Sequence, residues 1–138
     1  EMVTALQKLA QSTSILGFEH ADQGMGATLA FAAQQIEDWD GCVVCLGDMP
    51  FIETLTYSFI ADLVTVDSIV TPTFDSKMGN PVAFGKNLYT DLEALAGDSG
   101  GRRLTSMYPQ AVRELRVSDP GILQDIDTLE ELTLYQDS

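Results

Sequence analysis

Apolar positions along the chain follow two patterns: short continuous runs, and longer stretches in which apolar residues recur every three or four positions. Continuous runs are typical of buried strands, and spaced stretches are typical of helices with one face in a core. The runs predict strands at 14–18, 41–46, 68–73, 81–84 and 111–117. The spaced stretches predict helices at 2–10, 24–35, 52–64, 87–95, 99–107 and 128–135.

The alternation of predicted strands and helices indicates the fold class. Strands that alternate with helices form a parallel or mostly parallel sheet covered by helices on both faces. The 138 residues have the length of one domain with a core of its own. We therefore expect a single α/β domain over residues 1–138 with a mostly parallel sheet.

Acidic residues follow two of the predicted extended segments, and ligands of α/β sheets bind at the carboxyl ends of strands. Residues 46–50, with the sequence LGDMP, place Asp48 just after the strand predicted at 41–46. A carboxylate there suits Mg²⁺, which takes one or two protein carboxylates together with phosphate oxygens and water. Gly47 permits close approach of a ligand to the backbone. The alternative for Asp48 is a cap of the following helix.

Asp125 and Asp127 form a second acidic pair, within and just after the extended segment at 122–126. Residues two apart on an extended segment share one face, so both can meet one cation. A helix cap is the competing interpretation, since Thr128 and Glu131 have capping-box spacing and Asp127 would favour the helix N-terminus. The two interpretations are compatible, because one residue can cap the turn while its neighbour binds metal.

The charge balance excludes some classes of partner. The net charge is −14, with only 7 Lys and Arg residues. Nucleic-acid binders need a basic patch to neutralise phosphates, so we expect no nucleic-acid partner. No apolar run approaches the roughly 20 residues that span a bilayer, and no secretory signal pattern is visible. We expect a cytoplasmic protein without membrane association.

Cys42 and Cys45 form a C-x-x-C pattern inside the predicted strand at 41–46. Residues three apart on a strand point to opposite faces, so the two thiols cannot converge on a metal or form a redox pair. Zinc would also need further ligands, and His20 is the single histidine. We expect both cysteines to be core residues.

Three glycine-containing loops lie between the predicted elements, at 24–29 (GMGATL), 79–82 (GNPV) and 97–102 (GDSGGR). Amides at a helix N-terminus, as in the first loop, can receive a phosphate, a carboxylate or the edge of a base. Arg102 in the third loop offers a bidentate fork to an anion. Taken singly, each loop is better explained as a plain or solvated turn.

The order of these motifs is more specific than any one of them. GMG-x-[ST]-L, a strand ending in L-G-D-M-P, G-N-P-V, G-D-x-G-x-R and D-I-D-T-x-E-[DE]-L follow one another between residues 20 and 135. This series resembles the MobA-like nucleotidyltransferases, and best their molybdenum cofactor cytidylyltransferase branch. The resemblance implies a three-layer α/β/α fold of the GT-A and nucleotidyltransferase type. It also implies transfer of a nucleoside monophosphate from an NTP to an anionic acceptor such as molybdopterin, with release of pyrophosphate.

The resemblance also implies roles for individual residues. Asp48 would be the catalytic residue that holds Mg²⁺, Asp127 would be its second carboxylate ligand, and Asp125 would be a further contributor. The nucleotide would lie against Gly24, Met25, Gly26 and Gly47. The acceptor would face Asn80, Asp98 and Arg102.

The sequence departs from the family at the triphosphate loop. The family begins with a strand and a loop of the form L-A-A-G-x-S-x-R-M-G followed by a lysine, and no such run occurs here. We expect an N-terminally truncated domain that cannot by itself bind CTP productively. The missing central strand would leave an open sheet edge, which self-association would cover.

Several alternatives stay open from the sequence. GTP is the alternative to CTP, and the acceptor is not defined. A non-catalytic α/β interaction or assembly module derived from the same family is the competing function. A redox role ranks third, because no G-x-G-x-x-G dinucleotide fingerprint is present.

Overall fold

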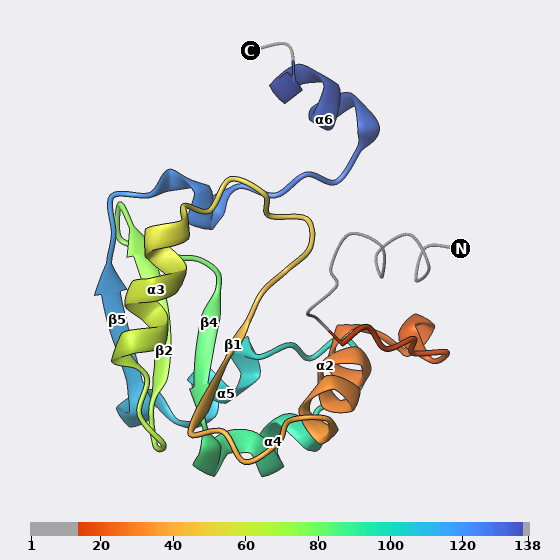
Figure 1. Cartoon of the computed structure of the whole chain (residues 1–138), viewed down its shortest axis with the longest axis vertical. Helices are drawn as coiled ribbons and strands as arrows, with labels where there is room; N and C mark the ends of the chain where they lie inside the picture. Colours follow the sequence, from red (N-terminus) through yellow and green to blue (C-terminus); the bar gives the residue numbers. More distant parts are fainter. Residues whose placement is uncertain (1–13, 137–138) are drawn as a thin grey trace.

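The computed structural model describes residues 14–136, so the helix predicted at 2–10 lies outside the described residues. The described chain forms one sheet flanked by helices (Figure 1). Its strands are β1 (Gly41–Val44), β2 (Ile69–Phe74), β3 (Lys77–Met78), β4 (Val82–Gly85) and β5 (Val112–Arg116). Its α-helices are α2 (Met25–Gln34), α3 (Thr54–Leu63), α4 (Tyr89–Glu93), α5 (Arg102–Met107) and α6 (Leu129–Gln136). Single 3₁₀ turns lie at η1 (Ala21–Gln23), η2 (Lys86–Leu88), η3 (Pro109–Ala111) and η4 (Pro120–Leu123).

The sheet has mixed strand directions. β4 pairs antiparallel with both β1 and β2, while β5 pairs parallel with β2. Strands β1, β2 and β5 therefore run the same way, as expected of an α/β fold, and β4 runs against them. The cause lies in the connection at 75–81, because a parallel connection needs about a dozen residues or more. This segment instead turns back at once and adds β3 along the last residues of β2.

Helices cover both faces of the sheet and make three layers. Ile69 and Phe84 point to one face, where they pack with residues of α2, α4 and α5. Val70 and Ala83 point to the other face, where they pack against Ile60 of α3. Alternate strand residues thus enter separate cores, which confirms the expected α/β fold class.

Two predictions about local structure were wrong. Residues 14–18 form no strand, because Phe18 stacks on Phe31 of α2 with ring centroids 4.7 Å apart rather than joining the sheet. In α3, the apolar positions of the helix predicted at 52–64 were expected to face a core, but two of them, Leu55 and Phe59, are 62% and 53% exposed. The buried residues of that helix are instead Thr56 and Ile60, and Ile60 packs against Val70 and Ala83 of the sheet.

Strand β1 lies at the edge of the sheet. Among residues 14–136 it pairs only with β4, and all four of its residues are partly exposed. No helix in this described part is long and apolar enough to cross a membrane.

Candidate metal and substrate site

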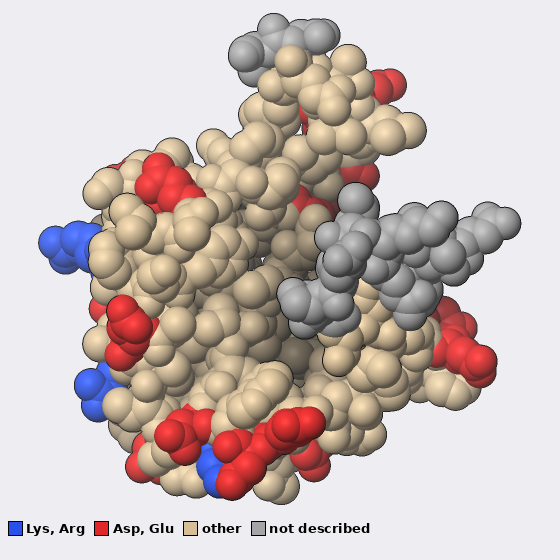
Figure 2. Space-filling model, viewed as in Figure 1, with Lys and Arg blue, Asp and Glu red and all other residues tan. Residues whose placement is uncertain are grey.

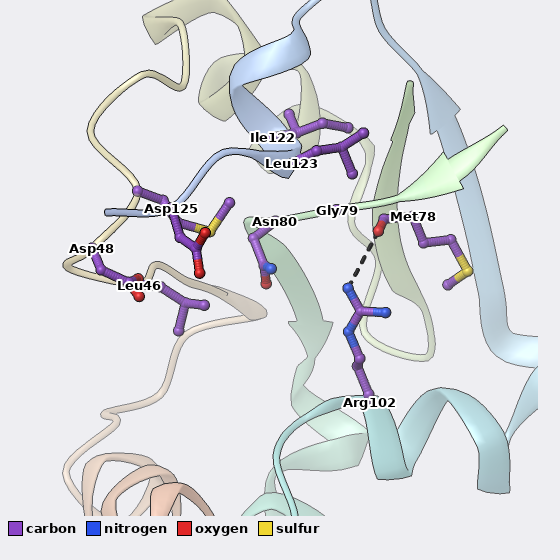
Figure 3. A pocket seen from close by; sticks show the side chains of 10 residues that line it. Leu46, Asp48, Met78, Gly79, Asn80, Arg102, Ile122, Leu123 and Asp125 are labelled. Atoms are coloured by element: carbon purple, nitrogen blue, oxygen red, sulfur yellow. Dashed lines mark hydrogen bonds between the residues drawn. The ribbon is translucent and has the colours of Figure 1, made fainter. Parts of the chain in front are cut away.

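Three carboxylates meet at the carboxyl end of β1. Asp48 follows that strand, and Asp125 and Asp127 follow η4. One oxygen from each side chain lies within 4.8 Å of one from each of the others, and all three residues are exposed. Figure 3 shows Asp48 and Asp125 extending toward the same space from their separate segments. The structure thus brings together the three acids predicted from the sequence, on one open edge of the fold.

Main-chain contacts join the two acid-bearing segments. The amide of Ile126 donates a 2.7 Å hydrogen bond to the carbonyl oxygen of Asp48. The amide of Met49 donates to the Leu46 carbonyl oxygen at 3.3 Å, which closes the turn that carries Asp48. Met49 itself is only 6% exposed and anchors that turn in the protein. The positions of the acids are therefore set by backbone and not by long flexible side chains.

The capping box predicted at the start of α6 is present in part, because the Glu131 carboxylate bonds the amide one residue before Thr128. The Glu131 amide donates to the Thr128 hydroxyl at 3.1 Å, and the Glu131 carboxylate accepts from the Asp127 amide at 2.7 Å. Asp127 contributes only its amide to this cap. Its carboxylate remains in the acidic cluster, so capping and cluster formation occur side by side.

The cluster carries concentrated negative charge. The Asp125 carboxylate beside it, followed by partial desolvation and the charges of Glu131 and Asp48, raises the pKa of Asp127 above its usual value. Within the described chain none of the three acids forms an ion pair with a Lys or Arg. Three exposed carboxylates without a cationic partner are suited to a divalent cation, whose preferred ligands are oxygens.

Two adjoining cavities open beside the cluster. The smaller, of about 190 Å³, is lined by Asp48 and Asp125 together with Met49, Met78, Gly79, Ile122 and Leu123. The larger, of about 550 Å³, has mostly apolar walls from α2, β1 and β4 and also includes Asp98. Leu46, Asn80 and Arg102 line both. On the face seen in Figure 2 the surface is hollowed in the middle, with acidic side chains spread around it.

Arg102 stands at the boundary between the two cavities. It begins α5, and its guanidinium donates to the carbonyl oxygen of Met78 at 3.2 Å (Figure 3). This bond uses one donor and leaves the exposed guanidinium further N–H groups for a ligand. Of the residues assigned to the acceptor by resemblance, Asn80 and Arg102 therefore border the acidic cavity. Asp98 lines the larger cavity and not the smaller one.

The GMG loop packs tightly against the loop at 96–99. The Gly26 amide donates to the Gly97 carbonyl oxygen at 2.7 Å. A Cβ at Gly24 would lie 2.4 Å from that oxygen, and a Cβ at Gly26 would lie 2.5 Å from the Ser99 oxygen. These two glycines thus have a packing role, whereas the exposed Met25 lines the larger cavity. A Cβ at Gly47 would meet no atom within 4 Å, so that backbone is open to a ligand.

The two cysteines are not equivalent. Cys42 packs against the core, and burial raises the pKa of its thiol to about 11. Cys45 was expected in the core, but it is exposed because β1 ends at Val44 and the chain turns toward the site. Neither thiol belongs to a group of candidate metal ligands among the described residues.

Asp119 is a buried acid near the site whose role the sequence did not reveal. Its carboxylate accepts hydrogen bonds from Glu53 and Thr56, which lie far away in the chain. The sequence showed only the turn D-P-G, and periodicity carries no signal for contacts of this kind.

The model of the MobA-like NTP transferase domain matches residues 3–114. The chain belongs to this family. The match includes Asp48, Asn80 and Arg102, while Asp125 and Asp127 lie beyond it. No protein of curated function matches the chain significantly.

Solved structures share the MobA-like fold. Rv0371c from Mycobacterium tuberculosis H37Rv is 28% identical with a TM-score of 0.70, and the match covers 82% of this chain and 60% of that one. Its complex with manganese is 25% identical with a TM-score of 0.71, covering 97% and 74%. A nucleotidyl transferase from Methanothermobacter thermautotrophicus gives a TM-score of 0.75 at 18% identity, covering 97% and 67%. The chain thus spans about 60% of the first of these proteins.

Proposed function

We propose that this chain carries the metal- and acceptor-binding part of a nucleotidyltransferase site. The reaction would move a nucleoside monophosphate, CMP, from CTP to an anionic acceptor such as molybdopterin, and release pyrophosphate. The carboxylate cluster of Asp48, Asp125 and Asp127 is the observation that carries this proposal. Family membership and the manganese complex of a similar protein support it.

The donor set fits a hard divalent cation. Three carboxylates within 4.8 Å of one another supply oxygen ligands and no nitrogen or sulfur, which suits Mg²⁺ or Mn²⁺. Asp48 and Asp127 would hold the ion, with Asp125 as a further ligand. The bound ion would neutralise charge on the phosphates.

The chain's own residues would orient the reactants. Arg102 would hold the anionic group of the acceptor through its remaining N–H donors, and Asn80 would offer an amide beside it. The base or ribose would lie against Met25 in the larger, mainly apolar cavity. Gly47, with open space above its Cα, would allow a phosphate to approach the backbone.

Triphosphate binding is the weak part of this site. No glycine-rich run followed by lysine occurs in the 138 residues, and the described cavities contain Arg102 as their one basic side chain. We therefore expect this chain by itself to bind the metal while it binds CTP weakly and does not turn it over.

A titration with Mn²⁺ followed by electron paramagnetic resonance tests the metal site. We expect one bound ion in the wild-type chain and a large loss of affinity in Asp48→Asn, with Asp62→Asn, an exposed acid of α3, as the matched control. Equal affinity in all three proteins would refute the site. Pyrophosphate release from CTP and GTP, measured with molybdopterin present, tests the expected inactivity, and release from either nucleotide would contradict it.

The exposed edge of β1 supports a second candidate, an assembly module that associates through this strand. Its four residues, Gly41–Val44, carry no charge that would discourage edge pairing. Sizing at two concentrations decides this candidate. A single monomeric elution volume at both would rule it out.

A further inference from the structure

Asp119 is a buried acid at the start of η4, the turn that precedes Asp125 and Asp127. It is 3% exposed, and its carboxylate accepts three hydrogen bonds. One oxygen accepts from the Glu53 amide at 2.9 Å and from the Thr56 hydroxyl at 2.7 Å. The other oxygen accepts from the Gly121 amide at 2.9 Å. Both oxygens therefore accept from donors inside the protein, and because Asp119 is buried it is not itself placed to bind a ligand.

The donors belong to the two segments that carry the clustered acids. Glu53 ends the segment that begins at Asp48, and it is the N-cap residue of α3. Gly121 lies in η4, the turn that leads directly to Asp125. The backbones also touch here, since a Cβ at Gly121 would lie 2.2 Å from the carbonyl oxygen of Phe51. Asp119 therefore joins the start of α3 to η4 at a point where the two backbones lie too close for a side chain at position 121.

The same turn, η4, also contacts the segment at 79–80, which lines the smaller cavity. The Ile122 carbonyl oxygen accepts from the Asn80 amide at 3.0 Å, and the Ile122 side chain is fully buried. A Cβ at Gly79 would lie 2.3 Å from that oxygen. A shift of η4 would therefore move Asn80 as well as the acids.

We propose that Asp119 is a positioning residue, which holds η4 against the start of α3 and so keeps Asp125 and Asp127 within reach of Asp48. This inference rests on the proposed metal site. It goes beyond it by assigning the geometry of the site to a residue that touches no ligand. The hydrogen bond from the Ile126 amide to the Asp48 carbonyl oxygen joins the same two segments. Exchange of the Ile126 amide proton therefore reports whether the segments remain in contact.

Thr56 offers a clean way to weaken the link without changing any charge. Thr56→Val removes the hydroxyl that donates to Asp119 and keeps the shape of the side chain, while Thr56→Ser keeps the hydroxyl. Asp119→Asn is the stronger change, because it leaves the Glu53 amide without its charged acceptor. Ser68→Ala is the control for general destabilisation. Its hydroxyl, buried before β2 at the far end of the sheet from the site, accepts from the Thr65 amide at 2.8 Å.

Two measurements are made on each variant: the affinity for Mn²⁺, and the exchange rate of the Ile126 amide proton by nuclear magnetic resonance. Removing an outer-shell partner typically weakens metal binding about 10- to 100-fold, and we expect that loss in Asp119→Asn and a smaller one in Thr56→Val. Exchange at Ile126 should accelerate in both variants. Thr56→Ser and Ser68→Ala should resemble the wild type in both measurements.

The outcomes separate this inference from the proposed function. If the Ile126 amide and the Mn²⁺ affinity are unchanged in Thr56→Val and Asp119→Asn, the positioning role is overturned. If Ser68→Ala changes both as much as Thr56→Val does, the effect is general destabilisation and the role is again overturned. If the wild type binds no Mn²⁺ but Ile126 exchanges faster only in Thr56→Val and Asp119→Asn, the positioning of the acids stands and the proposed metal function fails.

Discussion

The amide of Ile126 and the carbonyl oxygen of Asp48 are joined by a 2.7 Å hydrogen bond between segments far apart in the sequence. Because this bond is between backbones, the side chains on either side of it are brought together without rearrangement. Asp125 and Asp127 flank Ile126, and both carboxylates lie close to that of Asp48 in the folded chain. The fold thus holds like charges together, which costs stability unless a cation offsets it.

Removal of Asp125 should expose this cost. Its carboxylate is the largest cause of the raised pKa of Asp127, so Asp125→Asn should lower that pKa, as measured by nuclear magnetic resonance. When folding raises the pKa of a carboxyl, the folded protein loses stability as the pH rises from the unfolded-state pKa through the folded-state pKa. In EDTA, Asp125→Asn should therefore raise the unfolding temperature at pH 7 and have no such effect below the ordinary value of about 3.9.

In Mn²⁺ the sign should reverse, because Asp125→Asn removes one of the proposed ligands and so reduces the stabilisation that bound metal would supply. Asp62→Asn removes one charge outside the cluster. In EDTA and in Mn²⁺ alike, its unfolding temperature should equal that of the wild type in the same solution. A uniform response of the two variants would mean that the cluster has no special electrostatic character.

The glycines near the site should separate into two kinds. Gly24→Ala and Gly26→Ala would place a Cβ within 2.6 Å of backbone atoms of the loop at 96–99, and Gly24 also has a φ of 110°. We expect each to lower the free energy of unfolding by about 1–3 kcal/mol, measured with urea. Gly47→Ala meets no atom within 4 Å and should leave stability unchanged. If Gly47→Ala nevertheless weakens CTP binding, the ligand approaches that backbone as proposed.

Buried and exposed leucines should respond unequally to truncation of their side chains. Leu92 in α4 is fully buried, so Leu92→Ala should lower the free energy of unfolding by about 2–5 kcal/mol. Leu55 in α3 is 62% exposed, and Leu55→Ala should change it by no more than about 0.5 kcal/mol. A large loss in Leu55→Ala would show that this side chain is covered in solution.

The elements of the fold were predictable where one periodicity was unbroken. The apolar runs predicted the four longer strands to within a few residues, and the spaced leucines at 88, 92 and 95 predicted the helix they bury. Strand direction was harder, because it depends on how few residues connect β2 to β4. The segment at 14–18 looked like a strand because its pattern carries no information about the stacking of Phe18 on Phe31.

The sequence predicted which acids the fold brings together, but it did not predict the contacts that hold them in place. Asp48, Asp125 and Asp127 stood out because strand ends and residue spacing placed them before any contact was known. Asp119 did not stand out, because the role proposed for it depends on hydrogen bonds from Thr56 and other donors far away in the sequence. Spacing along a chain describes a face of one element, and it does not describe which elements a buried polar side chain joins.

The thiols provide a final prediction. At pH 8 about one Cys42 thiol in a thousand is ionised if its pKa is about 11, and the thiolate is the form that reacts. Iodoacetamide should therefore label the exposed Cys45 much faster than Cys42, as followed by mass spectrometry of the peptides. Labelling of Cys42 should accelerate about tenfold per pH unit up to its pKa, and the two sites should react alike in urea. Equal rates in the folded protein, or a disulfide formed under mild oxidation, would instead favour a redox role for this pair.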